Sequence, residues 1–246
     1  MRKNINSRIR DRFKVSLVKD GKLLAEAQGL RHRIFFGSEG TDKDEFDKYC
    51  KHLLITDKDT HKVVGGYRLL LGSVAEKNSG FYSESEFDLS QIKKNCKGEI
   101  LEMGRACVDN AYRRFPIINL MWKEIISYIA KNKVKYVFGC ASISEPSPEK
   151  IGKVLMYFKK RHFSPAKFMA SPLEGKAYPY ITNGDYLKAR EEKEILKYIP
   201  SLVYGYLRMG AFVCSEPVWD KEFNTADFFM LLDTAKMNAF YKSKFL

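Results

Sequence analysis

Glu102 and Arg105 lie inside an otherwise apolar, strand-like run from Glu99 to Asp109. Three residues apart on an extended strand, the two side chains point to opposite faces, so they form a same-face pair only if a bulge shifts the register. Gly104 lies between them and permits such a bulge. A carboxylate and a guanidinium brought together there can hold and deprotonate an amino-acid substrate, which is a reason to tolerate the cost of desolvating both charges. The alternative interpretation is a structural ion pair at a strand end.

Cysteine and histidine chemistry is less well supported. The five cysteines include no Cys-x-x-Cys pair, so neither a disulfide framework nor a zinc site is predicted, and reduced thiols favour a cytoplasmic protein. Cys107 and Cys140 fall on predicted strands, but no motif pairs either with a histidine, so a buried apolar role is favoured over a nucleophile. The four histidines show no metal-ligand spacing, and we predict no metal. These residues are Cys50, Cys96, Cys107, Cys140 and Cys214, and His32, His52, His61 and His162.

The composition suits one large domain with a sizeable core and an acidic partner. The chain has 246 residues, 45% of them hydrophobic, and a formal net charge of +13. That charge favours nucleic acid, anionic lipid or an acidic protein as the partner, but no nucleic-acid-binding module is recognisable. No apolar run approaches the length of a membrane span, so the protein is predicted neither to be secreted nor to cross a membrane.

The elements that must position the charged run follow from the periodicity of apolar residues. Four helices are predicted, and the stretch from about 164 to 198 is predicted to be an irregular insertion or lid within a single domain. This order indicates an α/β (α+β) fold in which helices flank a mixed, mostly antiparallel central sheet. The predicted strands are Phe13–Leu17, His52–Thr56, Lys62–Leu71, Glu99–Asp109, Val134–Ser142, Phe212–Val218 and Asp227–Leu232; the predicted helices run from Leu23 to Ile34, Pro116 to Ile129, Ser147 to His162 and Pro200 to Met209.

The order of elements and several short segments resemble the GNAT acyltransferase superfamily. More narrowly, the chain resembles the bacterial, hemolysin-like N-acyltransferases that make lyso-ornithine lipid, and their relatives the acyl-homoserine-lactone synthases. Each segment is weak by itself, but together they cover most of the chain. The segments are Leu30–Phe35, Asp44–Leu54, Gly66–Leu70, Phe81–Leu89, Leu101–Arg105, Phe138–Ser142 and Gly205–Ala211.

The resemblance implies a division of roles among these residues. Glu102 is the expected general base, and Arg105 orients it or the substrate carboxylate. Tyr206 matches a tyrosine that protonates the leaving thiolate in many GNAT enzymes, although packing is an alternative role. The substrate side of the cleft is expected to comprise Arg31, Phe35, Asp44, Asp47 and Arg68, with the acidic members attracting the ammonium groups of a cationic amino acid or merely balancing a basic surface.

The expected acyl-donor side departs from the superfamily's pattern. Its usual glycine-rich pyrophosphate loop is replaced by Tyr112–Asn119, which lacks glycine and contains Pro116, a residue without an N–H donor. An acyl carrier protein, with one phosphodiester and an acidic surface, is therefore favoured over free coenzyme A as the carrier of the thioester. Arg113 and Arg114 are the expected contacts, and Val108 and Asn119 complete the predicted donor side.

The function implied is transfer of a (3-hydroxy)fatty-acyl group from acyl carrier protein to the α-amine of an amino acid. Ornithine is the favoured acceptor, with glycine or lysine as alternatives, and no bound cofactor is expected beyond the acyl thioester co-substrate. An autoinducer synthase that uses S-adenosylmethionine, or a catalytically silent basic binding protein on the same scaffold, are the alternative functions. The enzyme is expected to be cytoplasmic, with a peripheral attachment to the inner membrane face.

Overall fold

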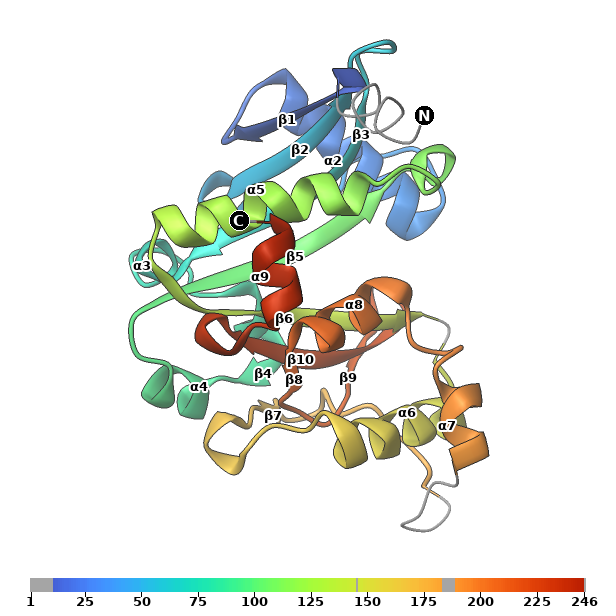
Figure 1. Cartoon of the computed structure of the whole chain (residues 1–246). Helices are drawn as coiled ribbons and strands as arrows, with labels where there is room; N and C mark the ends of the chain where they lie inside the picture. The colour runs from blue at the N-terminus through green and yellow to red at the C-terminus, as the bar shows by residue number, and fades with distance from the viewer. Residues whose placement is uncertain (1–10, 145, 183–188, 246) are drawn as a thin grey trace. The chain divides into compact units, whose positions relative to one another are not determined.

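The computed structural model describes residues 11–144, 146–182 and 189–245, which form two compact units (Figure 1). The first unit comprises Met1–Gly80, Leu101–Lys133 and Lys244–Leu246, and the second comprises Phe81–Ile100 and Val134–Ser243. Each unit has its own antiparallel strand ladders and its own covering helices. The predicted mixed α/β fold is confirmed.

The first unit is built on four antiparallel strands in the order β1 (Phe13–Val18), β2 (Lys51–Asp57), β3 (Val63–Leu71) and β5 (Glu99–Val108). Helix α2 (Lys22–Phe36) packs on β3 and ends at Gly37, whose φ of 69° suits the left-handed cap that glycine favours. Helix α5 (Ile117–Lys131) crosses the strands of this unit in Figure 1. The connections contain α3 (Gly72–Ala75), η1 (Glu45–Lys48) and η3 (Asn110–Tyr112).

The two helices bury opposite faces of this ladder. Neighbouring residues of a strand point to opposite faces, and a Cβ on Gly65 would meet Ile117 of α5, whereas one on Gly66 would meet Leu54. Leu54 packs in turn with Leu30 of α2. The strands are thus held between two apolar helix faces.

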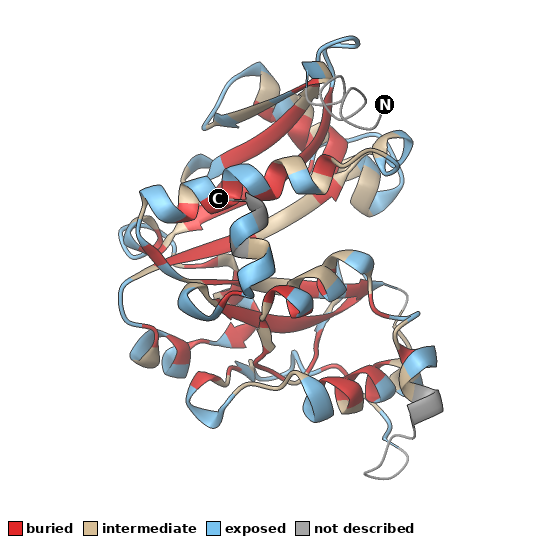
Figure 2. Cartoon of the chain, viewed as in Figure 1, coloured by how far each residue is buried: buried red, intermediate tan, exposed pale blue. Residues whose placement is uncertain are grey.

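The second unit has β10 (Thr225–Asp233) at its centre. It pairs along its length with β6 (Val134–Ser144), and on its other side with β8 (Phe212–Val213) and β9 (Val218–Asp220). Residues 225–232 are all buried, as Figure 2 shows for this strand. The other elements of this unit are η2 (Tyr82–Ser85), β4 (Phe87–Asp88), α4 (Ser90–Asn95), α6 (Pro148–Arg161), η4 (Ala166–Phe168), β7 (Ser171–Pro172), α7 (Ala189–Ile195), α8 (Ser201–Met209) and η5 (Thr234–Lys236), and α9 (Ala239–Phe245) begins in it.

The boundaries of the four predicted helices agree well with the structure, but one predicted strand does not. Ser147 accepts a hydrogen bond from the Lys150 N–H at the start of α6, and Gly210 ends α8 with a φ of 104°. The single strand predicted at 212–218 is wrong, because the chain leaves β10 after Val213 and returns at Val218. Pro217 has no N–H for a ladder, and the Ser215 hydroxyl instead accepts a hydrogen bond from the Phe229 N–H.

The predicted insertion at about 164–198 contains short elements rather than a purely irregular chain. It holds η4, β7 and α7, and β7 pairs with β4. Residues 183–188 of this stretch lie outside the described residues. In the part of the chain that the structure describes, no helix is both long and apolar enough to span a membrane.

Candidate active site

Strand β5 contains a β-bulge directly after Gly104. Gly104 is opposite Arg68 and Cys107 is opposite Gly66, so β5 has one more residue than β3 between these two pairs. Arg105 accommodates the extra length with a φ of 51°, a left-handed conformation that is uncommon for a residue with a side chain. A strained backbone of this kind persists only where its surroundings hold it, and such positions are concentrated at functional sites.

Arg31 of α2 is held by two aspartates from the acidic segment that follows. Its Nε lies 2.7 Å from Asp42 Oδ2, and its two terminal nitrogens donate to the two carboxylate oxygens of Asp47 at 3.0 and 2.9 Å. The Asp42 carbonyl oxygen accepts a further hydrogen bond from Arg31. A paired contact of this type fixes the plane of the guanidinium as well as its position.

Arg68 of β3 and Arg105 of the bulge bind the same acidic segment. Arg68 Nη1 lies 2.5 Å from Asp44 Oδ2 and 3.2 Å from Asp47 Oδ1. Arg105 contacts Asp42 Oδ2 through Nε and Asp44 Oδ2 through Nη2, both at 3.2 Å. The three arginines and three aspartates form one charge-balanced group, which we call the arginine–aspartate network: Arg31, Arg68, Arg105, Asp42, Asp44 and Asp47.

Neighbouring polar groups hold the acidic segment in place. The Asp44 carboxylate accepts hydrogen bonds from the N–H groups of Phe46 and Asp47 and so caps η1. Gln28 Nε2 donates to Asp47 Oδ2 at 2.8 Å. His52 Nε2 lies 3.0 Å from the Asp47 carbonyl oxygen, which can only accept, so Nε2 carries the proton. Burial lowers the pKa of His52 below its ordinary value, which favours the neutral ring.

Asp47 and Arg68 stay ionised at neutral pH. Burial acts to raise the pKa of Asp47, but the hydrogen bond and the charge of Arg31 outweigh it and lower that pKa to about 2. Burial likewise opposes the charge on Arg68, and Asp44 raises the pKa of Arg68 above its usual range. Asp47 is almost fully enclosed, whereas Asp44 and Arg105 have side chains that are 23% and 11% exposed, the most open of the six. Asp44 and Arg105 are therefore the members best placed to contact a ligand.

Glu102 lies two residues before Gly104 on the same strand and is opposite Leu70. Only 5% of its surface is exposed. Its charge acts on the thiol of Cys50, whose pKa is raised to about 12, mainly by burial. A small cavity beside the network is lined by the three arginines, His52 and Gly66, among others. Phe35, a predicted substrate residue, packs against the apolar cluster that contains Ala27 and Leu30.

The predicted donor residues surround the turn that joins β5 to α5. Val108 ends β5, and Arg113, Arg114 and Asn119 are exposed. A hydrogen bond attaches the turn to the end of β2, because the Tyr112 hydroxyl donates to Asp57 Oδ2 at 2.8 Å. Arg12 donates to the same carboxylate. Tyr206, the predicted acid, lies half-buried on α8 in the second unit.

Sequence reasoning missed Asp42 as part of this site. It is 8% exposed and binds both Arg31 and Arg105. The available signal was its place in an acidic segment that already contained Asp44 and Asp47. Neither the spacing nor the charge of Asp42 distinguishes it from its exposed neighbours Glu39 and Glu45.

Comparison with known proteins agrees with this geometry. Residues 28–123, which include the network and the bulge, match the family model of the acetyltransferase (GNAT) domain. An L-ornithine N(alpha)-acyltransferase of Brucella abortus (strain 2308) is 31% identical over 250 residues, covering 94% of this chain and 88% of the relative. A second, from Agrobacterium fabrum (strain C58 / ATCC 33970), is 30% identical over 247 residues, covering 92% and 83%.

A solved structure shows the same fold at low identity. FeeM, an N-acyl amino acid synthase from uncultured soil microbes, superimposes with a TM-score of 0.55 and 7% identity over 96% of each chain. The fold and the matched domain define a GNAT acyltransferase. Within that superfamily, the chain belongs to the family of N-acyltransferases that contains the L-ornithine N(alpha)-acyltransferases of Brucella and Agrobacterium. The predicted family and enzyme class are confirmed.

Proposed function

We propose that this enzyme transfers a (3-hydroxy)fatty-acyl group from acyl carrier protein to the α-amine of ornithine, giving a lyso-ornithine lipid. The observation that carries the proposal is the bulged β5, which contains both Glu102 and the network residue Arg105, in a chain that an L-ornithine N(alpha)-acyltransferase matches over 94% of its length. The name of those relatives supports ornithine as the acceptor. The network supports an acceptor that carries both signs of charge.

The acceptor contacts follow from the exposure of the network. Ornithine has one carboxylate and two ammonium groups, so it needs a cation and an anion from the protein. Arg105 binds the carboxylate, and Asp44 attracts the side-chain ammonium, since these are the most open members of the network. Arg68 pairs with Asp44, and Arg31 and Asp47 support the network through Asp42 and Arg68. Phe35 packs against the apolar cluster that contains the α2 residues Ala27 and Leu30 and shapes the substrate side from there.

The chemistry requires a neutral α-amine next to the thioester. Glu102 removes one proton from the α-ammonium, directly or through a water molecule, and the nitrogen then attacks the thioester carbonyl carbon. Backbone N–H groups beside the bulge polarise the carbonyl oxygen as charge develops on it. The tetrahedral intermediate loses the second nitrogen proton to solvent as the C–S bond breaks and the amide forms. The leaving thiolate takes a proton for which Tyr206 is the candidate donor, and Tyr206 then regains a proton from solvent.

The donor side favours a carrier protein over free coenzyme A. Pro116 precedes α5 without contributing an N–H, and the turn contains no glycine that would let backbone amides enclose a pyrophosphate. Arg113 and Arg114 present exposed charge instead. The net charge of +13 favours both an acidic carrier protein and peripheral attachment to an anionic inner membrane face, where the lipid product belongs.

The test is thiol release from a 3-hydroxyacyl carrier protein in the presence of separate acceptors: ornithine, lysine, glycine and S-adenosylmethionine. We expect release with ornithine, a product with the mass of the N-acyl amino acid, and slower release from the matching coenzyme A thioester. Release with S-adenosylmethionine alone would identify an autoinducer synthase instead. No release with any acceptor, from a protein that still binds the donor, would indicate a binding protein.

A further inference from the structure

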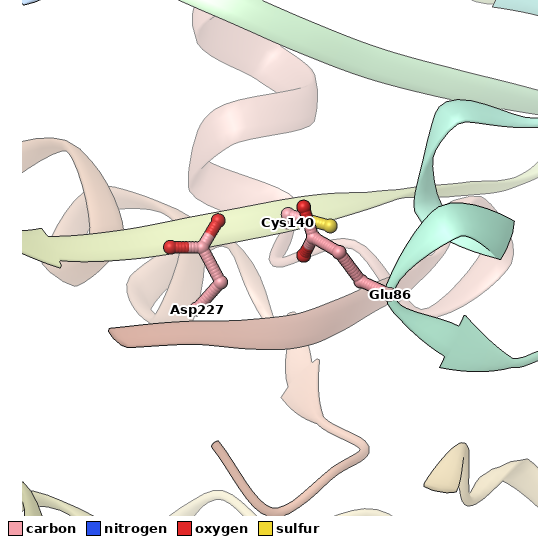
Figure 3. A group of neighbouring side chains, drawn as sticks. All are labelled: Glu86, Cys140 and Asp227. Carbon is pink, nitrogen blue, oxygen red and sulfur yellow. The ribbon is translucent and has the colours of Figure 1, made fainter. Parts of the chain in front are cut away.

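Three side chains with metal-binding atoms converge in the second unit, apart from the arginine–aspartate network. Glu86 joins η2 to β4, Cys140 lies in the middle of β6, and Asp227 lies near the start of β10. One ligand atom from each lies within 4.8 Å of those of the other two. Figure 3 shows the Glu86 carboxylate beside the Cys140 sulfur, with the Asp227 carboxylate on the neighbouring strand.

The sheet register places two of these residues on one face. Asp227 is opposite Ser142, and Phe229 is opposite Cys140. Because alternate residues of a strand share a face, Cys140, Ser142 and Asp227 all project from the same side of the β6–β10 ladder. Glu86 is brought to them by its neighbour Phe87, whose ring packs 5.8 Å from that of Phe229. The convergence is therefore fixed by the core of the unit.

The buried Glu86 carboxylate hydrogen-bonds with Cys140 and Tyr82, but these contacts satisfy only one of its two oxygens. Glu86 is 4% exposed, and its Oε2 accepts no hydrogen bond from any residue that the structure describes. Two carboxylates buried side by side repel each other, and a bound cation would neutralise that repulsion.

The other two residues are held in the manner of oriented metal ligands. Asp227 accepts hydrogen bonds from Thr225 Oγ1 at 2.6 Å and from Ser142 Oγ at 3.0 Å, which orient its carboxylate. The Cys140 thiol donates to Ser83 Oγ at 3.4 Å, and on loss of the thiol proton the Ser83 hydroxyl can rotate to donate to the thiolate. Outer hydrogen bonds of this kind fix the direction of a ligand atom before the metal binds. Ser142 is exposed and Cys140 is half-buried, so the cluster is within reach of solvent.

We propose that Glu86, Cys140 and Asp227 bind one Zn²⁺ ion, with a thiolate and two carboxylate oxygens as ligands and a fourth position open to water. A thiolate selects zinc over magnesium or calcium, which prefer oxygen ligands alone. Two carboxylates and a thiolate also leave the bound site with a single negative charge. Tetrahedral bonds of about 2.0–2.3 Å place ligand atoms about 3.5 Å apart, so the side chains close by about 1 Å on binding.

Metal binding by the full-length protein tests this proposal. After treatment with EDTA and dialysis, the protein is titrated with ZnSO₄ and its metal content is measured, and a parallel titration uses Co²⁺. We expect one equivalent of zinc that excess Mg²⁺ does not displace. With Co²⁺ we expect a thiolate-to-metal absorption band, because only a sulfur ligand produces it.

Variants assign the ligands. Cys140→Ala should abolish the cobalt band, and Glu86→Gln should weaken zinc binding by at least 100-fold. Thr225→Val, which removes an outer hydrogen bond to Asp227, should weaken it by about 10–100-fold. Glu84→Gln is the matched control, because Glu84 lies in the same segment but is half-exposed and pairs with Lys93. Circular dichroism establishes that each variant is folded.

A second readout needs no variant. Zinc bound to Cys140 should slow its reaction with a thiol reagent by at least tenfold in the native protein, and Mg²⁺ should not. The proposal is overturned if the folded wild-type protein binds less than one equivalent of zinc or loses it to Mg²⁺. It is equally overturned if Cys140→Ala and Glu86→Gln retain wild-type affinity.

Discussion

At the level of single residues, the site depends on buried charges that neutralise one another. Asp42, Asp44 and Asp47 each contact two arginines, and the arginines come from α2, β3 and β5. Removing one member leaves another charge buried without its partner, which costs more than the pair itself contributes. The network therefore fixes the positions of Arg105 and Asp44, but substitution of any of its members is expected to destabilise the fold.

Asp47→Asn should lower the free energy of unfolding by about 3–5 kcal/mol, because Arg31 and Arg68 both lose a buried charge partner. Urea unfolding followed by circular dichroism measures the change. Glu45→Gln is the control, since Glu45 lies in the same turn but is exposed. Equal midpoints for the two variants would show that the network does not stabilise the fold.

The same aspartate predicts an acid-dependent loss of stability. The pKa of Asp47 is lowered from 3.8 to about 2 on folding, so its contribution is complete above about pH 4 and is lost as the pH falls through 2. At 1.36 kcal/mol per pH unit, this contribution is about 2 kcal/mol. The gap in unfolding free energy between the wild type and Asp47→Asn should therefore narrow by that amount between pH 5 and pH 2. A constant gap over this range would contradict the pairing.

At the level of elements, the sequence correctly predicted the features that depend on local backbone geometry. Gly104 between two charged residues of an apolar run indicated the bulge, and Ser147-Pro148 indicated the start of α6, because both features depend on nearby backbone geometry. The strand predicted at 212–218 was wrong, because its pairing with β10 is decided by tertiary contacts such as that of Ser215 with Phe229. The short elements β4, α4 and α9 carry too few residues for a periodic signal.

Two helical glycines allow a matched test of packing. A Cβ on Gly152 of α6 would lie 1.8 Å from the backbone oxygen of Ile181, whereas one on Gly205 of α8 would meet nothing within 4 Å. Gly152→Ala should lower the melting temperature by several degrees, because the backbone at Ile181 must move. Gly205→Ala should raise stability by up to about 1 kcal/mol, since alanine favours the helix. Thermal unfolding of both variants measures this, and an unchanged Gly152→Ala protein would show that α6 does not pack closely on that backbone.

At the level of the whole molecule, composition indicated an acidic partner but not where it binds. The charge of +13 and the absence of a glycine-rich loop together favoured a carrier protein. The partners of the individual charges could not be predicted, because Arg105 and Asp44 are far apart in the chain and meet only through the fold. Glu86, Cys140 and Asp227 escaped notice for the same reason: metal-ligand spacing is a local signal, and these residues have none.

The proposed docking surface for the carrier protein is tested by reversing the charge of this enzyme's exposed arginines. Arg113→Glu together with Arg114→Glu should raise KM for the acyl carrier protein substrate at least tenfold, with little effect on kcat, because like charges repel the acidic partner before chemistry begins. The effect should diminish as salt is added. Lys176→Glu, an exposed change in the second unit, is the control. Equal KM values for the double variant and the control would place the docking surface elsewhere.

The most direct test of the central claim is the rate at which N-acylornithine forms with Glu102→Gln, which keeps the shape of the side chain but cannot accept the proton. With saturating 3-hydroxyacyl carrier protein and ornithine, kcat should fall by about 10²–10⁴-fold, as expected when a general base is removed. Glu99→Gln, on the same strand, should leave kcat within twofold of the wild type. If Glu102→Gln retains more than half of the wild-type kcat, Glu102 is not the base and the mechanism proposed here is wrong.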